Sequence, residues 1–548
     1  MTSTEKLIYS IDQNCNSLWD VPPKLHALGS NGYFPTQFLE DVDVAYTRHG
    51  AGVNSVDLRI ERERYYKTGG ADWGAAMFYS EFLGRVPVDI RLWEPMTGMT
   101  TKALAKALGT TIDDLYERYS PSDNWQLVGS SYVGDARRHR VLGDLDVSQI
   151  RPWLIKLLDI ARADMMRSFP ADQSQEMLKT WWEQQQSVIN TLLETHSKGK
   201  LIDLYRQWLD GDMGPRDGVS IDTTSRLFEL GRDRDQLDLL ELFTRQYDLL
   251  SQVYNQALDD TNSDLHPLDT SAGELPFFAV YNYQGHMVRS EVFLRDNMLV
   301  LPDKAFRLGA GGAIPVDELS AFGVRCLVGK AILLMIQARI GQGAALALPY
   351  LGSLYSPAAT RLEWLLKKLN LVKCPVKPIM RVRLRLLDRL RYVDTPIQLP
   401  AHLSSAFSND VIAARELGER WEQIRGDSAW NLSQLSSEAD RRVWRKKNFP
   451  QLTAKLDSLD DQRRALAQSN APAEQMRNVW KQMKPILEEL TRKTIERIDR
   501  DWQLANMDYW DSRGAILPWC LALGGEQFYH RVLQGARIYE ERQTFDDV

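Results

Sequence analysis

The sequence is poor in the residues that mark metal sites and disulfide frameworks. It has 4 cysteines in 548 residues, and Cys15, Cys326, Cys374 and Cys520 lie far apart with no C-x-x-C pair. Its 8 histidines form neither an H-x-x-x-H nor an H-E-x-x-H pattern. We therefore predict no metal site and no disulfide framework, which is typical of a reducing compartment.

Long apolar runs and an excess of positive charge are also lacking. The most apolar stretch is interrupted by Lys330 and Arg339, and the N-terminus has no basic region followed by an apolar core. We expect a cytoplasmic protein without a membrane-spanning segment. The formal net charge of -6 at pH 7 would not attract phosphate backbones, so nucleic acid is not predicted as a partner.

Several catalytic and nucleotide-binding motifs do not occur. The sequence contains no G-x-x-x-x-G-K-[ST], no G-x-G-x-x-G and no G-x-S-x-G. This excludes the P-loop, the dinucleotide fingerprint and the nucleophile elbow as mechanisms. Any nucleotide or anion site must be built in another way.

Hydrophobic periodicity predicts an α/β protein of several structural units. Residues 1–150 mix short β-rich runs with glycine turns, and residues 150–262 have the 3.6-residue period of helices. Strands resume after 276 as hairpins around Gln284-Gly285 and Asp296-Asn297. We expect residues 1–400 to form a Rossmann-like core that includes the helical connective region 150–262.

Residues 409–505 are predicted to form a long antiparallel helical hairpin, a coiled-coil arm. Asn470 is suited to end its first helix and Pro472 to open the second. The alternative is a pair of surface helices packed on the core. Residues 506–548 should return to the core as a helical segment. The hairpin is predicted from an apolar seam between its two helices, formed by Leu452, Leu456, Leu459, Leu466, Val479, Met483, Ile486 and Leu490. Further apolar residues lie outside this seam and favour a homodimer in which a second arm covers them: Trp444, Phe449, Trp480, Ile495, Ile498 and Trp502.

The stretch from Glu61 to Pro95 is typical of a strand, a glycine turn, a helix and a second strand. A glycine turn before a helix lets the backbone approach an anion and presents unpaired N–H groups to it. We therefore treat Thr68, Gly69, Gly70 and Gly74 as candidate anion-binding residues. The equally weighted alternative is a turn that only reverses the chain.

Two further groups of polar residues are candidates for a site. Arg137 and Arg138 could clamp a carboxylate or phosphate, with Asp135 or His139 for proton transfer. The alternative is a solvated turn with local salt bridges. Arg289 and Arg307 precede a second glycine-rich turn, 309–312, which could admit a substrate or serve only as a turn.

The glycine turn "TGGADWGAAMFYSEFLG" resembles the first signature of the class I nucleotidyltransferases and class I aminoacyl-tRNA synthetases. On that pattern Asp72, Trp73, Gly74 and Ala75 occupy the H-x-G-H positions. The resemblance implies adenylating chemistry with ATP, a role for Asp72 in catalysis and close approach of the ligand at Gly74. Because both histidines are replaced, a degenerate core is a second possibility.

A broader resemblance covers the order of elements along most of the chain. The stretch "DELSAFGVRCLVGKAILLMIQARIGQGAALALPYLGSLY" is similar to part of the cysteine-adding enzyme family of bacillithiol biosynthesis, with Arg325, Gly341, Gly343 and Tyr350 in comparable places. This implies a nucleotidyltransferase-like core, an inserted coiled coil and ATP or ADP as a cofactor. Arg325 and Tyr350 become candidate substrate-binding residues.

Together these features predict a ligase or transferase that joins an amino acid, with cysteine as one candidate, or another amine to an anionic small molecule. Two alternatives stay open. One is a non-catalytic assembly protein in which the core is a degenerate scaffold and the arm is the functional element. The other is a class I nucleotidyltransferase-like adenylating enzyme.

Overall fold

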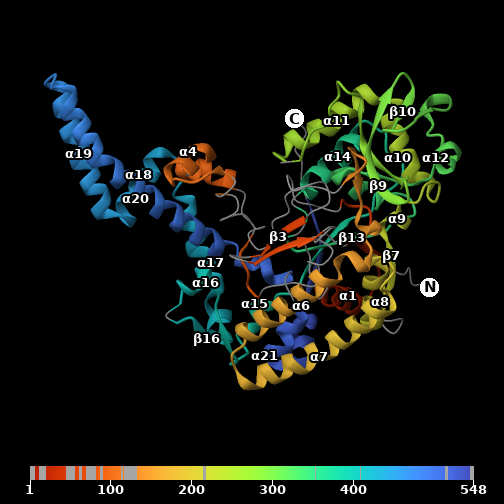
Figure 1. Cartoon of the computed structure of the whole chain (residues 1–548), viewed down its shortest axis with the longest axis horizontal. Coiled ribbons are helices and arrows are strands. Elements are labelled where there is room, and N and C mark those ends of the chain that lie inside the picture. Colours follow the sequence, from red (N-terminus) through yellow and green to blue (C-terminus); the bar gives the residue numbers. More distant parts are fainter. Residues whose placement is uncertain are drawn as a thin grey trace.

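The computed structural model describes residues 6–11, 20–44, 56–60, 64–68, 82–86, 90–112, 115, 132–213, 218–263, 265–351, 353, 355–407, 409–512 and 516–542. Within these residues the chain is a mixed α/β protein with both parallel and antiparallel strands, which confirms the predicted class. Figure 1 shows two sheets with their helices and a group of helices that projects from them.

A six-stranded sheet forms the centre of the fold. Its strand order is β17-β14-β13-β1-β2-β7, and every neighbouring pair is parallel except β14 and β17. The parallel strands, numbered by their order along the chain, therefore run 5-4-1-2-3 across the sheet. The strands are β1 (Lys6–Ile11), β2 (Tyr33–Leu39), β7 (Ser220–Thr223), β13 (Ala345–Pro349), β14 (Ile379–Arg383) and β17 (Arg537–Glu540).

Both faces of this sheet are buried, as parallel sheets require. Strand β1 illustrates this, because Ile8 packs into one hydrophobic core and Ile11 into another. Helices cover the two faces. The first core is built with α1 (Val21–Ser30), α6 (Val147–Ser168), α7 (Asp172–Thr195), α8 (Leu201–Met213) and α21 (Ile516–Gln534), and the second with α10 (Arg234–Arg245), α11 (Tyr247–Asp260), α13 (Ala331–Gln337) and α14 (Ser356–Lys368).

The region 150–262 is not helical throughout. Residues Ser220–Thr223 form β7, the edge strand beside β2. Its four residues are too few to disturb the helical period on either side, so the sequence pattern did not show it. The C-terminal segment differs in a similar way, since Arg537–Glu540 pairs with β14 as the strand β17.

A second, antiparallel sheet packs against the second core. Its hairpins turn at Gln284-Gly285 and Asp296-Asn297, all four of which have positive φ, and this confirms the predicted turns. The sheet contains β5 (Tyr132–Val133), β6 (Asp135–Arg140), β8 (Glu274–Tyr283), β9 (His286–Arg295), β10 (Met298–Val300), β11 (Ala305–Arg307) and β12 (Val324–Gly329).

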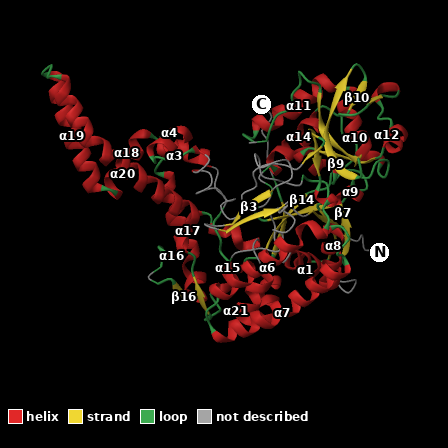
Figure 2. Ribbon diagram, viewed as in Figure 1, coloured by secondary structure: helices red, strands yellow, loops and turns green. Residues whose placement is uncertain are grey.

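Helices α17 (Ala414–Ser433), α18 (Glu438–Asn448), α19 (Pro450–Gln468) and α20 (Ala473–Ala505) project from the sheets, as Figure 2 shows. We call these four helices the arm. Asn470 has a positive φ of 51° and Pro472 precedes α20, as predicted for the turn. Val479, Met483 and Leu490 are buried along the seam. Helix α20 spans 33 residues, or about 50 Å at a rise of 1.5 Å per residue.

An early segment of the chain docks on the arm. It consists of η2 (Ile90–Leu92), α3 (Trp93–Thr97) and α4 (Thr101–Ala107), where a strand was expected after the glycine turn. Trp93 and Leu104 share a hydrophobic cluster with Trp444, Ile495 and Ile498. Most of the apolar arm residues that favoured a homodimer are thus covered by the same chain. Figure 1 shows α4 beside α18 and α20.

Short elements complete the described fold. No helix in the described ranges is long and apolar enough to cross a bilayer. The remaining elements are β3 (Val56–Ile60), β4 (Arg64–Thr68), η4 (Leu142–Asp144), α9 (Thr224–Leu227), η6 (Ala310–Gly312), α12 (Val316–Phe322), α15 (Leu386–Leu390), β15 (Pro396–Gln398), α16 (Ala401–Ser404), β16 (Val411–Ala413) and η7 (Met507–Ser512).

Candidate functional site

The carboxyl ends of the parallel strands mark the candidate site. In open α/β sheets ligands bind outside these ends, at the point where the strand order reverses direction. Here the reversal lies between β1 and β13, because β2 and β7 follow on one side of β1 and β13 and β14 follow on the other. The segments after β1 and β13 flank this point. Residues 12–19 after β1 lie outside the described residues, so the described part of this edge includes the segments after β2, β13 and β14.

Helix α1 offers little to a phosphate at this edge. Pro22 and Pro23 in its first turn have no N–H group. The preceding carboxylate, Asp20, accepts a hydrogen bond from the Ile516 backbone N–H at 3.2 Å and adds negative charge. Ligand binding at the edge must therefore depend on side chains.

Three carboxyl groups follow β2 directly. One oxygen of Glu40 accepts hydrogen bonds from the backbone N–H groups of Val42 and Asp43, both at 3.1 Å. Asp41 accepts from the Ser225 backbone N–H at 2.7 Å and from the Ser225 hydroxyl. Burial, reinforced by the charges of Asp43 and Asp41, raises the pKa of Glu40 to about 8. Glu40 is therefore mostly protonated at neutral pH.

His139 and Arg289 lie opposite each other on β6 and β9. Arg289 Nη1 donates to Asp43 Oδ1 at 3.0 Å, and the guanidinium carbon lies 4.1 Å from the centre of the Phe278 ring. Arg289 Nε is buried and has no hydrogen-bond partner among the described residues. Burial, and then the charge of Arg289, lower the pKa of His139 to about 4, so the imidazole is neutral at pH 7.

This arrangement combines an acid, a base and a cation, which we call the Glu40 group (Glu40, Asp43, His139 and Arg289). Glu40 can donate a proton and His139 can accept one near neutral pH, and such a separation of pKa values is typical of acid–base pairs. The Arg289 side chain is 17% exposed, and because its Nε is buried, a carboxylate or phosphate would contact the Nη groups. In the described part of the chain no cluster of histidine, cysteine and acidic residues is arranged to hold a metal.

Two of these residues, His139 and Arg289, were candidates from the sequence, whereas Glu40 and Asp43 were not. The available signal was the acidic run Glu40-Asp41-Val42-Asp43 at the end of an apolar strand. Its partner Arg289 lies 246 positions away from Asp43 along the chain, so local patterns could not connect them.

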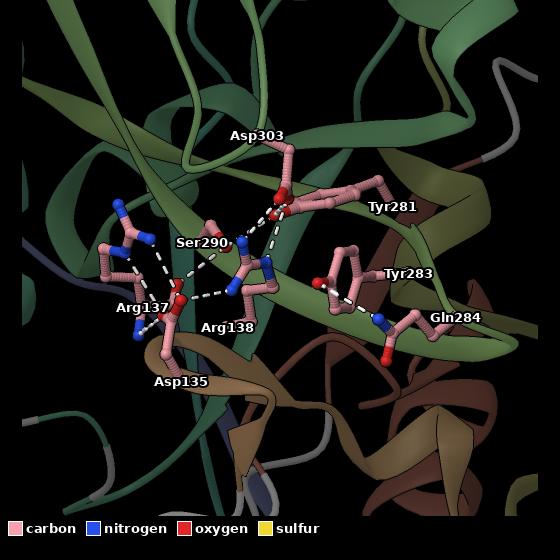
Figure 3. A network of polar contacts seen from close by, with 8 residues as sticks. All are labelled: Asp135, Arg137, Arg138, Tyr281, Tyr283, Gln284, Ser290 and Asp303. Atoms are coloured by element: carbon pink, nitrogen blue, oxygen red, sulfur yellow. Dashed lines mark hydrogen bonds and ion pairs between the residues drawn. The ribbon is translucent and has the colours of Figure 1, made fainter.

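The other early candidates on β6 form a closed network, shown in Figure 3. Arg138 donates to Asp135 Oδ2 at 2.5 Å and to Asp303 Oδ2 at 2.9 Å, and its guanidinium carbon lies 4.2 Å from the centre of the Tyr283 ring. Arg137 pairs with Asp135 at 3.0 Å. The hydrogen bond from Arg137, followed by the one from Arg138, holds the pKa of Asp135 well below its usual range.

Asp135 therefore stays ionised and is poorly suited to proton transfer, and Arg138 has its charge neutralised by two carboxylates. This differs from the predicted clamp and matches the alternative, a turn with local salt bridges. The physical reason is that the two arginines bind acids of their own sheet.

The remaining candidates do not converge on one point. Arg307 is exposed on β11, opposite Met298. Met298 pairs with Arg295, six residues beyond Arg289 on β9, which places Arg307 about 20 Å from Arg289 at the usual rise of a strand. The two arginines therefore lie far apart on the sheet, while the glycine turn that they were expected to face lies outside the described residues. Arg325 is exposed on β12. Burial raises the pKa of Asp41, and the charge of Arg325 opposes that rise.

Gly312 in the second glycine-rich turn is packed against α10. Its carbonyl accepts from the Thr244 hydroxyl at 2.6 Å, and an added Cβ would lie 2.8 Å from the Arg245 side chain. These contacts favour a structural turn.

The first glycine turn lies mostly outside the described residues. Thr68 ends strand β4, as predicted, whereas Gly69, Gly70, Asp72 and Gly74 fall beyond what the structure describes. Tyr350 directly follows β13 at the point where the strand order reverses. It is therefore one of the resemblance-based candidates that the fold places at the sheet edge.

Neither a known family nor a curated relative suggests a function for this chain. No protein-family model matches the chain, and no curated protein matches it. The geometry of the sheet edge must carry the functional argument.

Proposed function

We propose that the protein is a cytoplasmic ligase or transferase that joins an amino acid, with cysteine as one candidate, or another amine to an anionic small molecule. The observation that carries this proposal is the Glu40 group at the carboxyl edge of the parallel sheet. Arg289 would bind the anion, while Glu40 and His139 would move the protons that a condensation with an amine requires.

The parallel strand order also supports a Rossmann-like nucleotide-binding core. Read from the other edge, the order is 3-2-1-4-5, which is the doubly wound order 3-2-1-4-5-6 without its last strand, and in that arrangement ligands bind at the reversal point. The resemblance to the cysteine-adding enzymes of bacillithiol biosynthesis points the same way and suggests ATP or ADP. Because α1 offers few N–H groups, we propose that side-chain cations at the edge would hold the phosphates.

A non-catalytic assembly role is the second candidate. It is favoured by the arm, where Trp430, Val443 and Trp480 are 63%, 68% and 50% exposed. Large exposed apolar side chains on a projecting element are typical of a contact surface. In that case the arm would form a coiled coil with its partner and the core would be a scaffold.

Incubating the purified protein with ATP, cysteine and candidate anionic acceptors, followed by mass spectrometry, separates the two classes. A product whose mass equals acceptor plus amino acid minus water supports the ligase proposal. Absence of any product with every acceptor, together with a stable arm-mediated complex, supports the assembly role.

Replacing Arg289 with glutamine should weaken anion binding about 10- to 30-fold, because a partly buried cation is lost. ADP and malate are suitable probes, measured by titration calorimetry. Arg289→Lys should retain part of the affinity. The control is Arg307→Gln, whose exposed side chain is remote from the edge and should leave both affinities unchanged. Equal affinity in the native protein and Arg289→Gln would contradict this assignment.

The arm is further proposed to hold two copies together as a homodimer. Most of the apolar residues that favoured a homodimer are covered within the chain, and Trp480 is the member of that set that stays exposed, so we propose it as a contact with a partner copy. Trp480→Glu should convert a dimer into a monomer in sedimentation at micromolar concentration, whereas Val188→Glu, an exposed apolar position on α7, should not. A native protein that sediments as a monomer would overturn this proposal.

A further inference from the structure

A second polar group surrounds Tyr350 at the other side of the reversal point. It contains Arg383 at the end of β14, Arg425 on the arm helix α17, and Asp508 and Asp511 on η7, which follows α20. All four charges act on the phenol, whose pKa is raised by burial first, lowered by the two arginines and raised by the two aspartates. We call these five residues the Tyr350 group.

Arg383 is held in place by Asp511. Its Nε donates to Asp511 Oδ2 at 2.8 Å, Nη2 lies 2.6 Å from the same oxygen, and the guanidinium carbon lies 4.3 Å from the centre of the Tyr350 ring. Asp511 is fully buried and also accepts from the Leu387 backbone N–H at 3.0 Å. These contacts with Asp511 involve Nε and Nη2, so Nη1 is the donor that a ligand would contact.

Asp508 is the acidic counterpart on the other side of the phenol. Arg425 Nε lies 3.1 Å from its Oδ1, and the Tyr350 hydroxyl donates to Oδ2 only at 3.5 Å, the limit for a hydrogen bond. Asp508 is 3% exposed, whereas Arg425 is 45% exposed and can move at low cost. One oxygen of a buried carboxylate is thus weakly satisfied beside the sheet edge.

The charges of this group decide which ligand it can take. Two arginines and two aspartates balance, so a bare anion or a bare cation would leave an uncompensated charge in a partly buried place. A zwitterion keeps the balance. Its carboxylate can reach Nη1 of Arg383, and its ammonium group can reach Asp508 Oδ2 next to the Tyr350 hydroxyl.

We propose that the Tyr350 group is a binding subsite for a zwitterionic ammonium carboxylate, that is, a free α-amino acid. The proposal rests on the proposed function, because it supplies the place of the amine-bearing substrate. The ends of β13 and β2 are separated only by β1, which puts the subsite about 10 Å from Glu40 at the usual strand spacing. An amino acid bound there would lie beside the anion held at Arg289.

The test measures binding to the full-length protein rather than turnover. Each standard L-amino acid is titrated by calorimetry, and the tightest binder is compared with its decarboxylated amine and its deaminated acid. We expect the amino acid to bind at least about tenfold more tightly than either analogue, because each analogue loses one charge-assisted contact. No binding of any amino acid, or equal binding of one analogue, would overturn the subsite.

Variants assign the contacts. Asp508→Asn should weaken amino-acid binding about tenfold and leave the affinity for the deaminated acid unchanged. Tyr350→Phe keeps the aromatic ring under Arg383 and should also weaken amino-acid binding. It serves as the test if Asp508→Asn does not fold. The control Arg415→Gln removes an exposed ion pair with Asp394 and should change nothing. Unaltered selectivity in folded Asp508→Asn or Tyr350→Phe would refute the subsite.

The two proposals fail separately. Amino-acid binding that needs Asp508, in a protein that forms no product with any acceptor, would leave the subsite standing and refute the ligase. Product formation with full activity in Asp508→Asn would support the ligase and refute the subsite.

Discussion

Glu40→Gln is expected to lower turnover about 100- to 10,000-fold, the usual contribution of a positioned general acid or base. Glutamine keeps the size of the side chain and can still accept from the backbone N–H groups of Val42 and Asp43, so the loop after β2 should persist. Only the exchangeable carboxyl proton is lost. The measurement is the rate of product formation in the mass-spectrometric assay, with the exposed Glu318→Gln as a matched control that should retain full activity.

The pH dependence follows from the two pKa values in this group. Glu40, with a pKa of about 8, works as an acid only while protonated, so activity should fall as pH rises above about 8. His139, with a pKa of about 4, works as a base only while neutral, so activity should fall below about 4. A rate that stays constant from pH 6 to 10 would contradict the role of Glu40.

Stability gives a check on Glu40 that does not need a substrate. Its folded-state pKa lies above the ordinary value, so its contribution to stability is present at low pH and is lost as pH rises through about 8. Glutamine cannot ionise. The free energy of unfolding of Glu40→Gln should therefore exceed that of the native protein at pH 9 and approach it at pH 5. The same difference at both pH values would show that Glu40 ionises normally.

Local features of the fold could be predicted from the sequence, and long-range ones could not. The hairpin turns at Gln284-Gly285 and Asp296-Asn297, and the turn at Asn470, follow from residues that tolerate positive φ. The neighbours of Glu40 depend instead on the way that β2, β6 and β9 come together. No spacing along the chain encodes that contact.

The arm shows the same limit. Its apolar residues could be recognised from their helical spacing, but their partner could not. Arg441 on α18 donates to the carbonyl of Pro95 at 2.8 Å, a contact that spans 346 positions. Because a segment so far away in sequence covers Trp444 and Ile495, the surface that suggested a partner copy is smaller than the sequence indicated.

The second large effect is expected at Arg138, and it concerns stability rather than binding. Arg138→Met should lower the free energy of unfolding by about 2–3 kcal/mol, because it removes the ion-pair partner of Asp303, whereas Asp135 keeps its pair with Arg137. This figure is below the usual cost of breaking a buried ion pair, since Asp135 is 41% and Asp303 22% exposed and water screens them in part. Urea denaturation followed by tryptophan fluorescence measures the change.

Arg137→Met is the matched control, because Arg137 is the adjacent residue and also pairs with Asp135 but is 64% exposed. It should unfold at nearly the native urea concentration. Neither variant should change the affinity for ADP or malate, since Arg138 has its charge neutralised within the network of Figure 3 and does not belong to the Glu40 group. The opposite result would be an Arg138→Met protein that is as stable as the native protein but binds anions more weakly. It would show that Arg138 binds an anion rather than stabilises the sheet. The pair of variants therefore distinguishes a structural arginine from a binding arginine at adjacent positions of one strand.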